Sequence, residues 1–472
     1  FTGHFNFFDH HFSHASSAFY PSPFIESAII VIDAVGEWNC TTISKGDHNN
    51  INMLSNIDYP NSLGMLYSAF TEFSGFNVNA DEYKLMGLAP YGMPIYKDLI
   101  LSELIKVKSD GSYKINLKYF NYHKGITTIN AEFEKLFKNK KRLLDEPIRV
   151  IDENMASSIQ SVMNLILINI AKYAKKITNS DNLVLAGGVA LNCVSVGKIS
   201  EERIFKKIWV QPASGDAGTS LGAAFAEFYK NNDRTIKNLT KFNPYLGPSY
   251  NDNEIKNILT NNKHNYIHQT DKNELIKFIC ENLVKEKVIG LFSGRMEFGP
   301  RALGARSIIA DPRSVKMQKR LNKIIKYRES FRPFAPIVLK EYANDHFEMF
   351  DESPYMSIIS KIKHTFSIDS NNDLIQSEKL KSIKSKFPAI THVDNSARIQ
   401  TISEDSETLI YDILKYFNKI TNCPMLINTS FNVNNEPIVC SPDDAIKCFN
   451  SNNMDILILN NFTLSMNSFC NF

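Results

Sequence analysis

The chain has 472 residues, of which 43% are hydrophobic and 22% are charged, and its formal net charge is +3. This length predicts two domains, and the composition is typical of a soluble globular protein. A net charge this small gives no argument for binding to nucleic acid or to a membrane. The seven cysteines form no Cys-x-x-Cys pair, which indicates a reducing cytoplasm and argues against a cysteine-ligated zinc site.

We find no signal peptide and no apolar run of membrane-spanning length in the sequence. It begins at Phe1 rather than Met and enters its first motif almost at once. We therefore expect that an N-terminal segment is missing from this chain.

The first motif is a histidine pair followed by an acid. His10 and His14 are four residues apart, so a helix would place both imidazoles on one side. Asp33 comes directly after the apolar run 28–32, and a carboxylate at a strand end can complete a metal site. The alternative is a capped or surface histidine pair, and the motif alone does not identify the metal.

The pattern of apolar residues predicts an alternation of strands and helices in the first half. We expect two strands within 28–45 around a turn at Gly36, a helix over 62–74, a glycine- and proline-rich turn at 85–92, a lysine-rich peripheral insertion at 95–148, a long helix over 150–178, strands at 183–186 and 207–210, and a helix over 219–228. This order is typical of an α/β domain with ligand-facing loops at its strand ends.

A second α/β unit is expected after a polar linker at 230–252. Its predicted strands are 287–292, 334–339, 425–427 and 456–459, and a charged stretch at 362–386 is expected to form a mobile excursion. We therefore place one domain at 1–240 and another at 253–472.

Two glycine-containing loops follow predicted strands of the first half. Gly187 and Gly188 precede Asn192, and paired glycines there can turn backbone N–H groups towards a phosphate or ribose; tight packing is the alternative. Asp216 lies between glycines in 214–218, so it could be a fourth metal ligand or the N-cap of the next helix.

The most unusual composition lies in 293–332. Its arginines stand among glycines and apolar residues, unlike a solvated charged face. They are Arg295, Arg301, Arg306 and Arg313, followed by Lys326, Arg328 and Arg332. Planar guanidinium groups bind phosphate oxygens bidentately, so the cluster predicts anion binding, although surface exposure or ion pairs could explain some members.

Polar side chains also follow a predicted strand near the C-terminus. Asn428, Thr429 and Ser430 could bind a nucleotide or line an oxyanion site. His392 could be a base or a phosphate donor, or a structural histidine.

Taken together, the chain resembles the O-carbamoyltransferase family of the NodU, CmcH and TobZ type. The resemblance runs over nearly the whole chain and rests on ordered motifs: the His-His-x-Ser-His-Ala run at 10–15, Asp-Ala-Val-Gly-Glu at 33–37, 81–92, 186–192, 214–218, the arginine block and 428–432. It implies an actin/sugar-kinase/Hsp70-like first domain and a YrdC-like second domain, both α/β.

The resemblance also implies the chemistry. The YrdC-like domain would make carbamoyl-adenylate from carbamoyl phosphate and ATP, and the first domain would transfer the carbamoyl group to a hydroxyl and release AMP. The implied metal ligands are His10, His14, Asp33 and Asp216, with Fe(II) as the metal.

The expected site residues fall into two further sets. We assign catalytic roles to His14, Arg301, Arg306 and Arg332, and nucleotide- or phosphate-binding roles to Lys84, Gly187, Gly188, Asn192, Arg295, Lys326, Arg328, Asn428, Thr429 and Ser430. His14 or His11 could be the base that deprotonates the acceptor, although a metal-bound histidine cannot easily serve.

We therefore expect a cytoplasmic, biosynthetic, ATP-dependent O-carbamoyltransferase that acts on a sugar or another small hydroxylated molecule. The alternatives are a non-catalytic nucleotide-binding scaffold of the same fold, or carbamoyl transfer to a nitrogen or tRNA acceptor, although the chain has no basic stripe for nucleic acid. A sugar kinase is less consistent with the arginine block. The family makes a homodimer reasonable.

Overall fold

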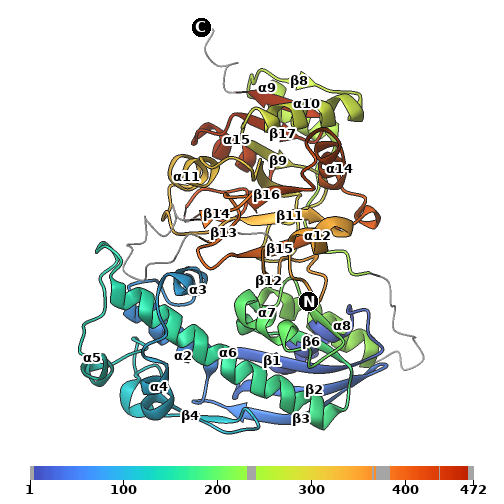
Figure 1. Cartoon of the computed structure of the whole chain (residues 1–472). Coiled ribbons are helices and arrows are strands. Elements are labelled where there is room, and N and C mark those ends of the chain that lie inside the picture. Colours follow the sequence, from blue (N-terminus) through green and yellow to red (C-terminus); the bar gives the residue numbers. More distant parts are fainter. Residues whose placement is uncertain (1–4, 231–240, 364–365, 368–382, 435, 466–472) are drawn as a thin grey trace. The chain divides into compact units, whose positions relative to one another are not determined.

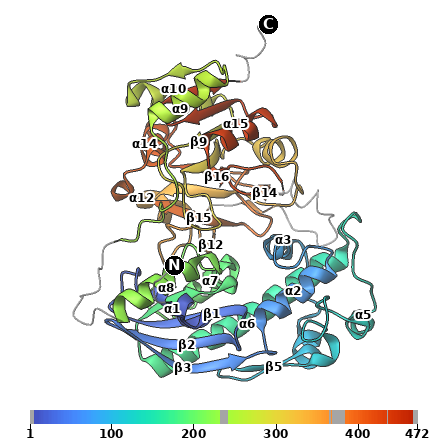
Figure 2. The same ribbon diagram turned by 180° about the vertical axis from the view of Figure 1, so that it is seen from behind.

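The computed structural model describes residues 5–230, 241–363, 366–367, 383–434 and 436–465. The chain divides into two compact units, Phe1–Phe242 and Asn243–Phe472 (Figures 1 and 2). Part of the expected linker, 231–240, and most of the expected excursion at 362–386 lie outside the described residues. Residues 243–252 of that linker belong to the second unit.

The first unit alternates strands and helices around one main sheet. Its elements are α1 (His10–Phe19), β1 (Glu26–Gly36), β2 (Asn39–Asp47), β3 (Asn50–Asp58), α2 (Leu63–Phe73), α3 (Glu82–Leu88), η1 (Ala89–Tyr91), α4 (Lys97–Leu99), η2 (Ile100–Leu104), β4 (Ile105–Val107), β5 (Tyr113–Ile115), η3 (Leu117–Tyr119), α5 (Ala131–Phe137), α6 (Val150–Thr178), β6 (Asn182–Ala186), η4 (Gly188–Leu191), α7 (Cys193–Glu201), β7 (Lys207–Val210) and α8 (Ala217–Lys230).

The main sheet of this unit has the strand order β3-β2-β1-β6-β7. β1 pairs antiparallel with β2 and parallel with β6, which pairs parallel with β7. The apolar run of β1 is buried without alternation, as expected for a central strand covered on both faces. α1 packs against α8, and α6 packs against α2 and α7. The carboxyl ends of β1, β6 and β7 therefore meet at one edge.

Most predicted elements of this half are confirmed. The long helix has the predicted bounds. At its start, the Asp152 side chain accepts the backbone N–H of Arg149, and Asn179, in the left-handed conformation, follows its last residue. The turn predicted at 85–92 is wrong, because α3 and η1 occupy it. Leu85 and Leu88 are buried there, and Pro90 sits near the start of η1, where a missing N–H has little cost.

The second unit is built on a nine-stranded mixed sheet of order β12-β15-β11-β16-β10-β9-β17-β18-β8. Its elements are α9 (Asp252–Asn261), β8 (Ile267–His268), α10 (Lys272–Val284), β9 (Ile289–Phe292), β10 (Arg306–Ala310), α11 (Met317–Arg320), η5 (Leu321–Ile325), β11 (Ala335–Leu339), α12 (Lys340–His346), β12 (Ile358–Lys361), β13 (Phe366–Ser367), β14 (Ile383–Lys384), β15 (Ser396–Ile402), η6 (Glu404–Ser406), α14 (Leu409–Thr421), β16 (Met425–Ser430), α15 (Pro442–Asn450), β17 (Ile456–Leu459) and β18 (Phe462–Ser465).

Four strands of this sheet were predicted, and two that matter for the site were not. The confirmed strands are β9, β11, β16 and β17; β10 and β15 were missed. β10 runs antiparallel between β9 and β16, so the segment 293–305 connects two neighbouring strands. The α/β class is confirmed in both units. Within the described residues, no helix combines the length and the apolar character needed to cross a membrane.

Candidate functional site

α1 and the end of β1 bring three predicted residues of the first unit together. His14 Nε2 lies 2.9 Å from Asp33 Oδ2 and 3.0 Å from His10 Nε2, and His10 Nε2 lies 3.2 Å from the same Asp33 oxygen. The His14 side chain is completely buried, whereas that of His10 is 24% exposed. The helical spacing and the strand end therefore make one compact group of ligand atoms.

Asp216 joins this group from the turn before α8. Its Oδ1 lies 3.5 Å from His10 Nε2 and 3.6 Å from His14 Nε2, while its own carbonyl accepts the Thr219 N–H. One ligand atom from each of the four residues lies within 4.8 Å of the others. We call His10, His14, Asp33 and Asp216 the histidine–carboxylate cluster.

The dimensions and donor types of this cluster fit a divalent cation. A cation about 2.1 Å from each ligand holds neighbouring ligand atoms roughly 3.0–3.4 Å apart, close to the separations observed. Two histidines with a carboxylate are a donor set that suits iron and related transition metals. The prediction that these four residues act as metal ligands stays a prediction.

Backbone groups fix the orientation of the Asp33 carboxylate. Its Oδ1 accepts the N–H of Ala34 at 2.8 Å and the N–H of Gly188 at 3.3 Å, which leaves Oδ2 towards the histidines. Burial acts to raise the pKa of Asp33, but the hydrogen bonds from His10 and His14 hold it well below its usual value. The bond to Asp33 raises the pKa of His10 against the opposing effect of burial.

Two neighbours of the cluster hold α1 in register with β1. An added Cβ on Gly36 would lie 2.3 Å from Cδ2 of His10, so only glycine permits this approach. Both carboxylate oxygens of Glu37 lie 3.1 Å from the backbone N–H of His10, at the start of α1. Sequence reasoning did not assign Glu37, although its place after the strand end was a usable signal.

The predicted phosphate loop at the end of β6 is occupied by contacts within the protein. Gly187 has a φ of +86°, and Gly188 donates to Asp33 as described. Asn192 caps α7 by accepting the Ser195 N–H at 3.1 Å, and it donates to Gln160 Oε1 at 3.1 Å. Gln160 was not predicted. A nucleotide-binding role for the loop stays a prediction.

Two further candidates of the first unit have specific partners. Lys84 is buried, and its Nζ lies 3.0 Å from Asp81 Oδ1 in an ion pair. His11 is buried with Nδ1 at 3.1 Å from Thr42 Oγ1, and burial lowers its pKa to about 4. The His14 Nε2 atom is engaged in the cluster. The role of His14 or His11 as the base stays a prediction.

In the second unit, the predicted arginine block forms the connection between β9 and β10. We call residues 293–306 the arginine loop. Arg306 is fully buried over the ring of Phe292, and its terminal nitrogens donate to the carbonyls of Ser293, Gly294 and Pro248 at 3.2 Å and of Ala305 at 3.1 Å. Burial lowers its pKa to about 10. Contact of Arg306 with a substrate stays a prediction.

Lys326 lies beside the end of β16. Its Nζ donates to the Ser430 carbonyl at 2.7 Å, to Ser430 Oγ at 3.2 Å, to the Asn432 carbonyl at 2.8 Å and to Asn432 Oδ1. Burial, followed by the charges of Arg328 and Arg332, holds the pKa of Lys326 well below its usual value. The structure thus brings Lys326 and Ser430 together.

The remaining predicted residues of this unit are divided between these two places. Asn428 Nδ2 donates to the Ala302 carbonyl at 3.1 Å and to Gln400 Oε1 at 2.7 Å, so it supports the arginine loop. The other positions are as follows: Arg295 is exposed and donates to the Leu246 carbonyl; Arg301 is half-buried within the loop; Arg328 Nε donates to Asn322; Arg332 lies 3.5 Å from Glu329; Thr429 is half-buried on β16.

Arg313 stands apart from the expected anion-binding set. Its guanidinium group binds both carboxylate oxygens of Asp311, at 2.5–3.1 Å, so its charge already has a counter-ion. This contact corresponds to the ion-pair alternative that the sequence left open for some members of the cluster. His392, in turn, has Nδ1 3.5 Å from Asp394 Oδ1.

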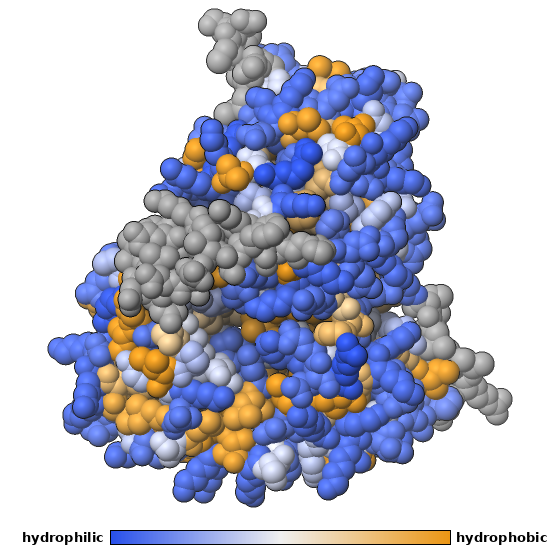
Figure 3. All heavy atoms as spheres, viewed as in Figure 1, coloured by the Kyte–Doolittle hydropathy of each residue, from blue (hydrophilic) through white to orange (hydrophobic). Residues whose placement is uncertain are grey.

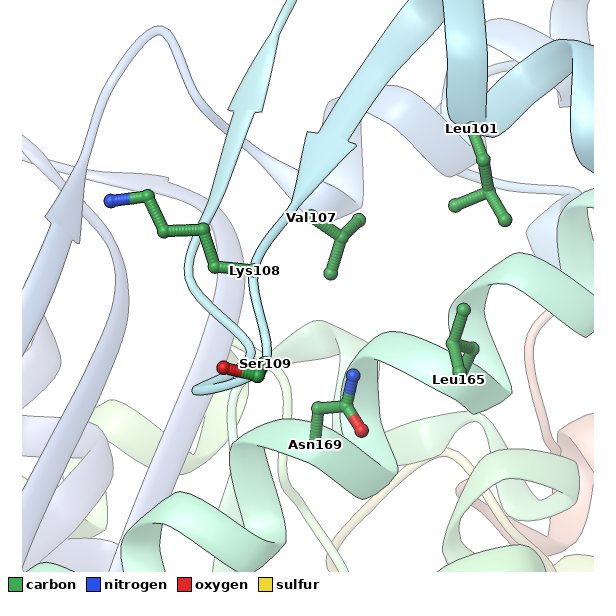
Figure 4. A pocket seen from close by; sticks show the side chains of 6 residues that line it. All are labelled: Leu101, Val107, Lys108, Ser109, Leu165 and Asn169. Carbon is green, nitrogen blue, oxygen red and sulfur yellow. The ribbon is translucent and has the colours of Figure 1, made fainter.

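A hollow of about 300 Å³ in the first unit is separate from these groups. It is lined by Leu101, Val107, Lys108, Ser109, Leu165 and Asn169, and the three apolar side chains point towards the gap while Lys108 points away (Figure 4). Hydrophobic residues also gather on the visible face of this unit over α4 and β4 (Figure 3). No predicted site residue lines the hollow.

Comparison with known protein families gives matches in both halves of the chain. The family model described as "Carbamoyltransferase N-terminus" matches residues 1–225, and the one described as "Carbamoyltransferase C-terminus" matches residues 280–466. The two matched regions each fall within one of the two structural units.

Several proteins resemble the chain over almost its whole length. "Uncharacterized protein sll1178" of Synechocystis sp. is 46% identical and is matched over 97% of this chain and 76% of its own length. "Nodulation protein NolNO" of Sinorhizobium fredii is 34% identical over 97% of this chain and 64% of its own, and "Nodulation protein NolO" of Bradyrhizobium diazoefficiens is 32% identical over 96% and 78%.

A solved structure, "Crystal structure of T.kodakarensis HypF", also matches. The match covers 50% of this chain and 38% of that chain, with 16% identity and a TM-score of 0.26. A likeness at this level supports no conclusion about the fold or the activity.

Proposed function

Because the chain belongs to the carbamoyltransferase family, we propose that it is an ATP-dependent O-carbamoyltransferase that works through carbamoyl-adenylate. It is a carbamoyl-transferring enzyme by family membership. Family membership does not specify the two half-reactions that we assign to the units. It also does not specify the metal or the acceptor.

The observation that carries the proposal is a pair of buried basic side chains in the second unit. Arg306 and Lys326 are buried, and neither forms an ion pair within the described part of the chain. Burial disfavours the protonated form of both side chains and lowers the pKa of each, whereas a bound anion stabilises that form. Polyphosphate supplies such an anion, and guanidinium groups suit its tetrahedral oxygens.

The adenylate-forming reaction would take place in this second unit. Water releases phosphate from carbamoyl phosphate, and an oxygen of the resulting carbamate attacks the α-phosphorus of ATP. A carbamoyl-adenylate anhydride bond forms as pyrophosphate leaves. Arginine side chains, with Arg301 and Arg332 as our candidates, would stabilise the charge on the departing pyrophosphate.

The transfer reaction would take place in the first unit at the histidine–carboxylate cluster. His10, His14, Asp33 and Asp216 would hold a divalent cation, for which Fe(II) is our choice on the donor set. Such a cation polarises a carbonyl or phosphate oxygen. The acceptor hydroxyl takes the carbamoyl carbon, its proton leaves to a base, and AMP departs.

We further propose that the acceptor is a hydroxyl of a sugar or another small metabolite, and that the enzyme forms a homodimer. The relatives named nodulation proteins NolNO and NolO align with almost the whole of this chain, and this similarity supports a small-molecule acceptor.

The test is pyrophosphate release from ATP with and without carbamoyl phosphate. We expect release that requires carbamoyl phosphate and falls at least a hundredfold in Arg301→Ala. Arg320→Ala is the matched control, because Arg320 lies in the same unit but pairs with Asp455 at 2.7 Å outside the arginine loop. Folded protein that releases no pyrophosphate would favour a binding scaffold instead.

A second measurement separates the two half-reactions. His14→Ala should still release pyrophosphate but should not pass the carbamoyl group to an acceptor hydroxyl. Loss of both reactions together would contradict the assignment of the adenylate step to the second unit alone. Transfer to tRNA in place of a small hydroxylated molecule would overturn the proposed acceptor class.

A further inference from the structure

Glu297 is the only acidic residue of the arginine loop, and it is buried with 4% exposure. Its Oε1 accepts three backbone N–H groups, those of Leu303 and Ala305 at 2.7 Å and that of Arg306 at 3.1 Å. One carboxylate oxygen therefore holds three backbone N–H groups of the second half of the loop close to one another. Its Oε2 is buried without a hydrogen-bond partner among the described residues.

Other side chains hold the carbonyl side of the same segment. Gln400 Nε2 donates to the Leu303 carbonyl at 2.8 Å, and Asn428 Nδ2 donates to the Ala302 carbonyl. Tyr245 Oη also donates to the Leu303 carbonyl at 3.0 Å. The backbone that follows Arg301 is thus fixed by contacts on both its N–H and its C=O groups.

Glycines allow the chain to fold round the Glu297 carboxylate. Gly299 has a φ of +132° and Gly304 a φ of +114°, which other residues rarely adopt. Arg301 lies between them in the sequence, at the part of the loop that Glu297 closes. Glu297 therefore fixes the backbone two to five residues after Arg301.

We propose that Glu297 is the positioning residue of Arg301: its carboxylate gathers the N–H groups of residues 303, 305 and 306 and so places the Arg301 guanidinium for the pyrophosphate of the adenylate reaction. This proposal rests on the proposed function for the role of Arg301. The gathering of the three N–H groups does not depend on it.

The side chain must reach all three N–H groups, so we expect its length to matter more than its charge. Glu297→Gln keeps an oxygen acceptor at the same reach, whereas Glu297→Asp keeps the charge but withdraws it by one methylene. We expect Glu297→Asp to lower kcat/KM for carbamoyl phosphate-dependent pyrophosphate release about a hundredfold. We expect Glu297→Gln to retain most of the wild-type value.

A double-mutant cycle shows whether Glu297 acts through Arg301. In the Arg301→Ala background, Glu297→Asp should cause little further loss. An equal loss in both backgrounds would overturn the proposal. Asp271→Ala is the matched control, because Asp271 accepts the N–H groups of Asn273 and Glu274 at the start of α10, away from the arginine loop; it should leave kcat/KM unchanged.

Hydrogen exchange tests the loop without reference to activity. The amides of residues 303, 305 and 306 should lose protection in Glu297→Asp and keep it in Glu297→Gln. Unchanged protection in Glu297→Asp would overturn the proposal even if activity fell. A wild-type chain that releases no pyrophosphate would overturn the proposed function and the role of Arg301, while the exchange result would still decide how the loop is held.

Discussion

The backbone N–H of Gly188 donates to Oδ1 of Asp33 at 3.3 Å, so two sequence motifs 155 residues apart contribute to the same site. The diglycine turn at the end of β6 steadies the carboxylate at the end of β1. The opposite oxygen of that carboxylate then faces His10 and His14. Parallel pairing of β1 and β6 brings the two strand ends together.

Metal removal should destabilise the chain measurably if the histidine–carboxylate cluster holds a cation. With Fe(II) at about a hundred times its dissociation constant, binding contributes about 2.7 kcal/mol to the free energy of unfolding. A chelator should therefore lower the Tm of the wild-type chain by roughly 5–10 °C. Thermal unfolding with and without chelator measures this shift.

His14→Ala is the variant that should abolish the chelator effect, because it removes the completely buried ligand. His48→Ala is its control: His48 is 78% exposed and pairs with Asp47 outside the cluster. A shift of equal size in wild type and His14→Ala would contradict metal binding at this place.

Gly36→Ala should weaken metal binding without touching a ligand. The new Cβ would overlap the His10 ring at 2.3 Å, so His10 must move away from Asp33. We expect a loss of about 10- to 100-fold in metal affinity. This range is typical of substitutions at residues that orient a metal ligand without binding the metal themselves. Equilibrium dialysis with Fe(II) under anaerobic conditions measures it.

The same substitution at Gly215 is the control for this prediction. An added Cβ there meets nothing within 4 Å, although Gly215 directly precedes Asp216. Gly215→Ala should therefore bind metal like the wild-type chain. Equal losses at Gly36 and Gly215 would show that backbone flexibility, rather than the position of His10, controls the affinity.

The histidine–carboxylate cluster was largely predictable because its signals are local. A spacing of four on a helix places His10 and His14 together, and Asp33 ends an apolar strand. Asp216 was recognisable from its flanking glycines after a strand. Its meeting with the histidines depends on the order of β1, β6 and β7 in the sheet.

The supporting residues were not predictable from local pattern. Gln400 reaches Leu303 across 97 positions, and Glu297 folds back on N–H groups whose positions depend on the glycines between them. The arginine motif was interpreted as a source of positive charge for a ligand, yet the Arg306 guanidinium group donates hydrogen bonds to backbone carbonyls of the protein. Motif composition predicts an anionic ligand, but it does not identify the side chains that hold the loop.

Lys84→Met should destabilise the first unit, because it leaves Asp81 as a buried charge without its partner. Both side chains are at most 7% exposed and lie 3.0 Å apart. Removing one member of such a pair costs about 3–5 kcal/mol. Urea unfolding measures the loss, and the double variant Asp81→Asn with Lys84→Met should recover part of it.

Lys135→Met is the control for the buried pair. Lys135 pairs with Glu132 at the same spacing of three residues, but the side chains are 71% and 43% exposed. Its removal should leave the urea midpoint unchanged. If Lys84→Met were equally harmless to stability but abolished ATP binding, the nucleotide-binding role expected for Lys84 would be favoured over the ion pair.

Lys326 should make the stability of the chain rise with pH. Burial, reinforced by Arg328 and Arg332, lowers its pKa well below the ordinary value of 10.5 in the folded chain. Between the lowered and the ordinary pKa, the unfolded chain binds a proton that the folded chain does not. Raising the pH through this window therefore favours folding, by at most about 1.4 kcal/mol per pH unit.

The measurement is the difference in the free energy of unfolding between wild type and Lys326→Met at pH 7, 8 and 9. We expect this difference to shift in favour of wild type as the pH rises. Lys316→Met, at an exposed lysine of the same unit, controls for the loss of one charge. Bound pyrophosphate should make this free-energy difference less dependent on pH, because its negative charge stabilises the protonated amine of Lys326 beside Ser430. A pH dependence that is the same with and without pyrophosphate would show that the anion binds away from Lys326.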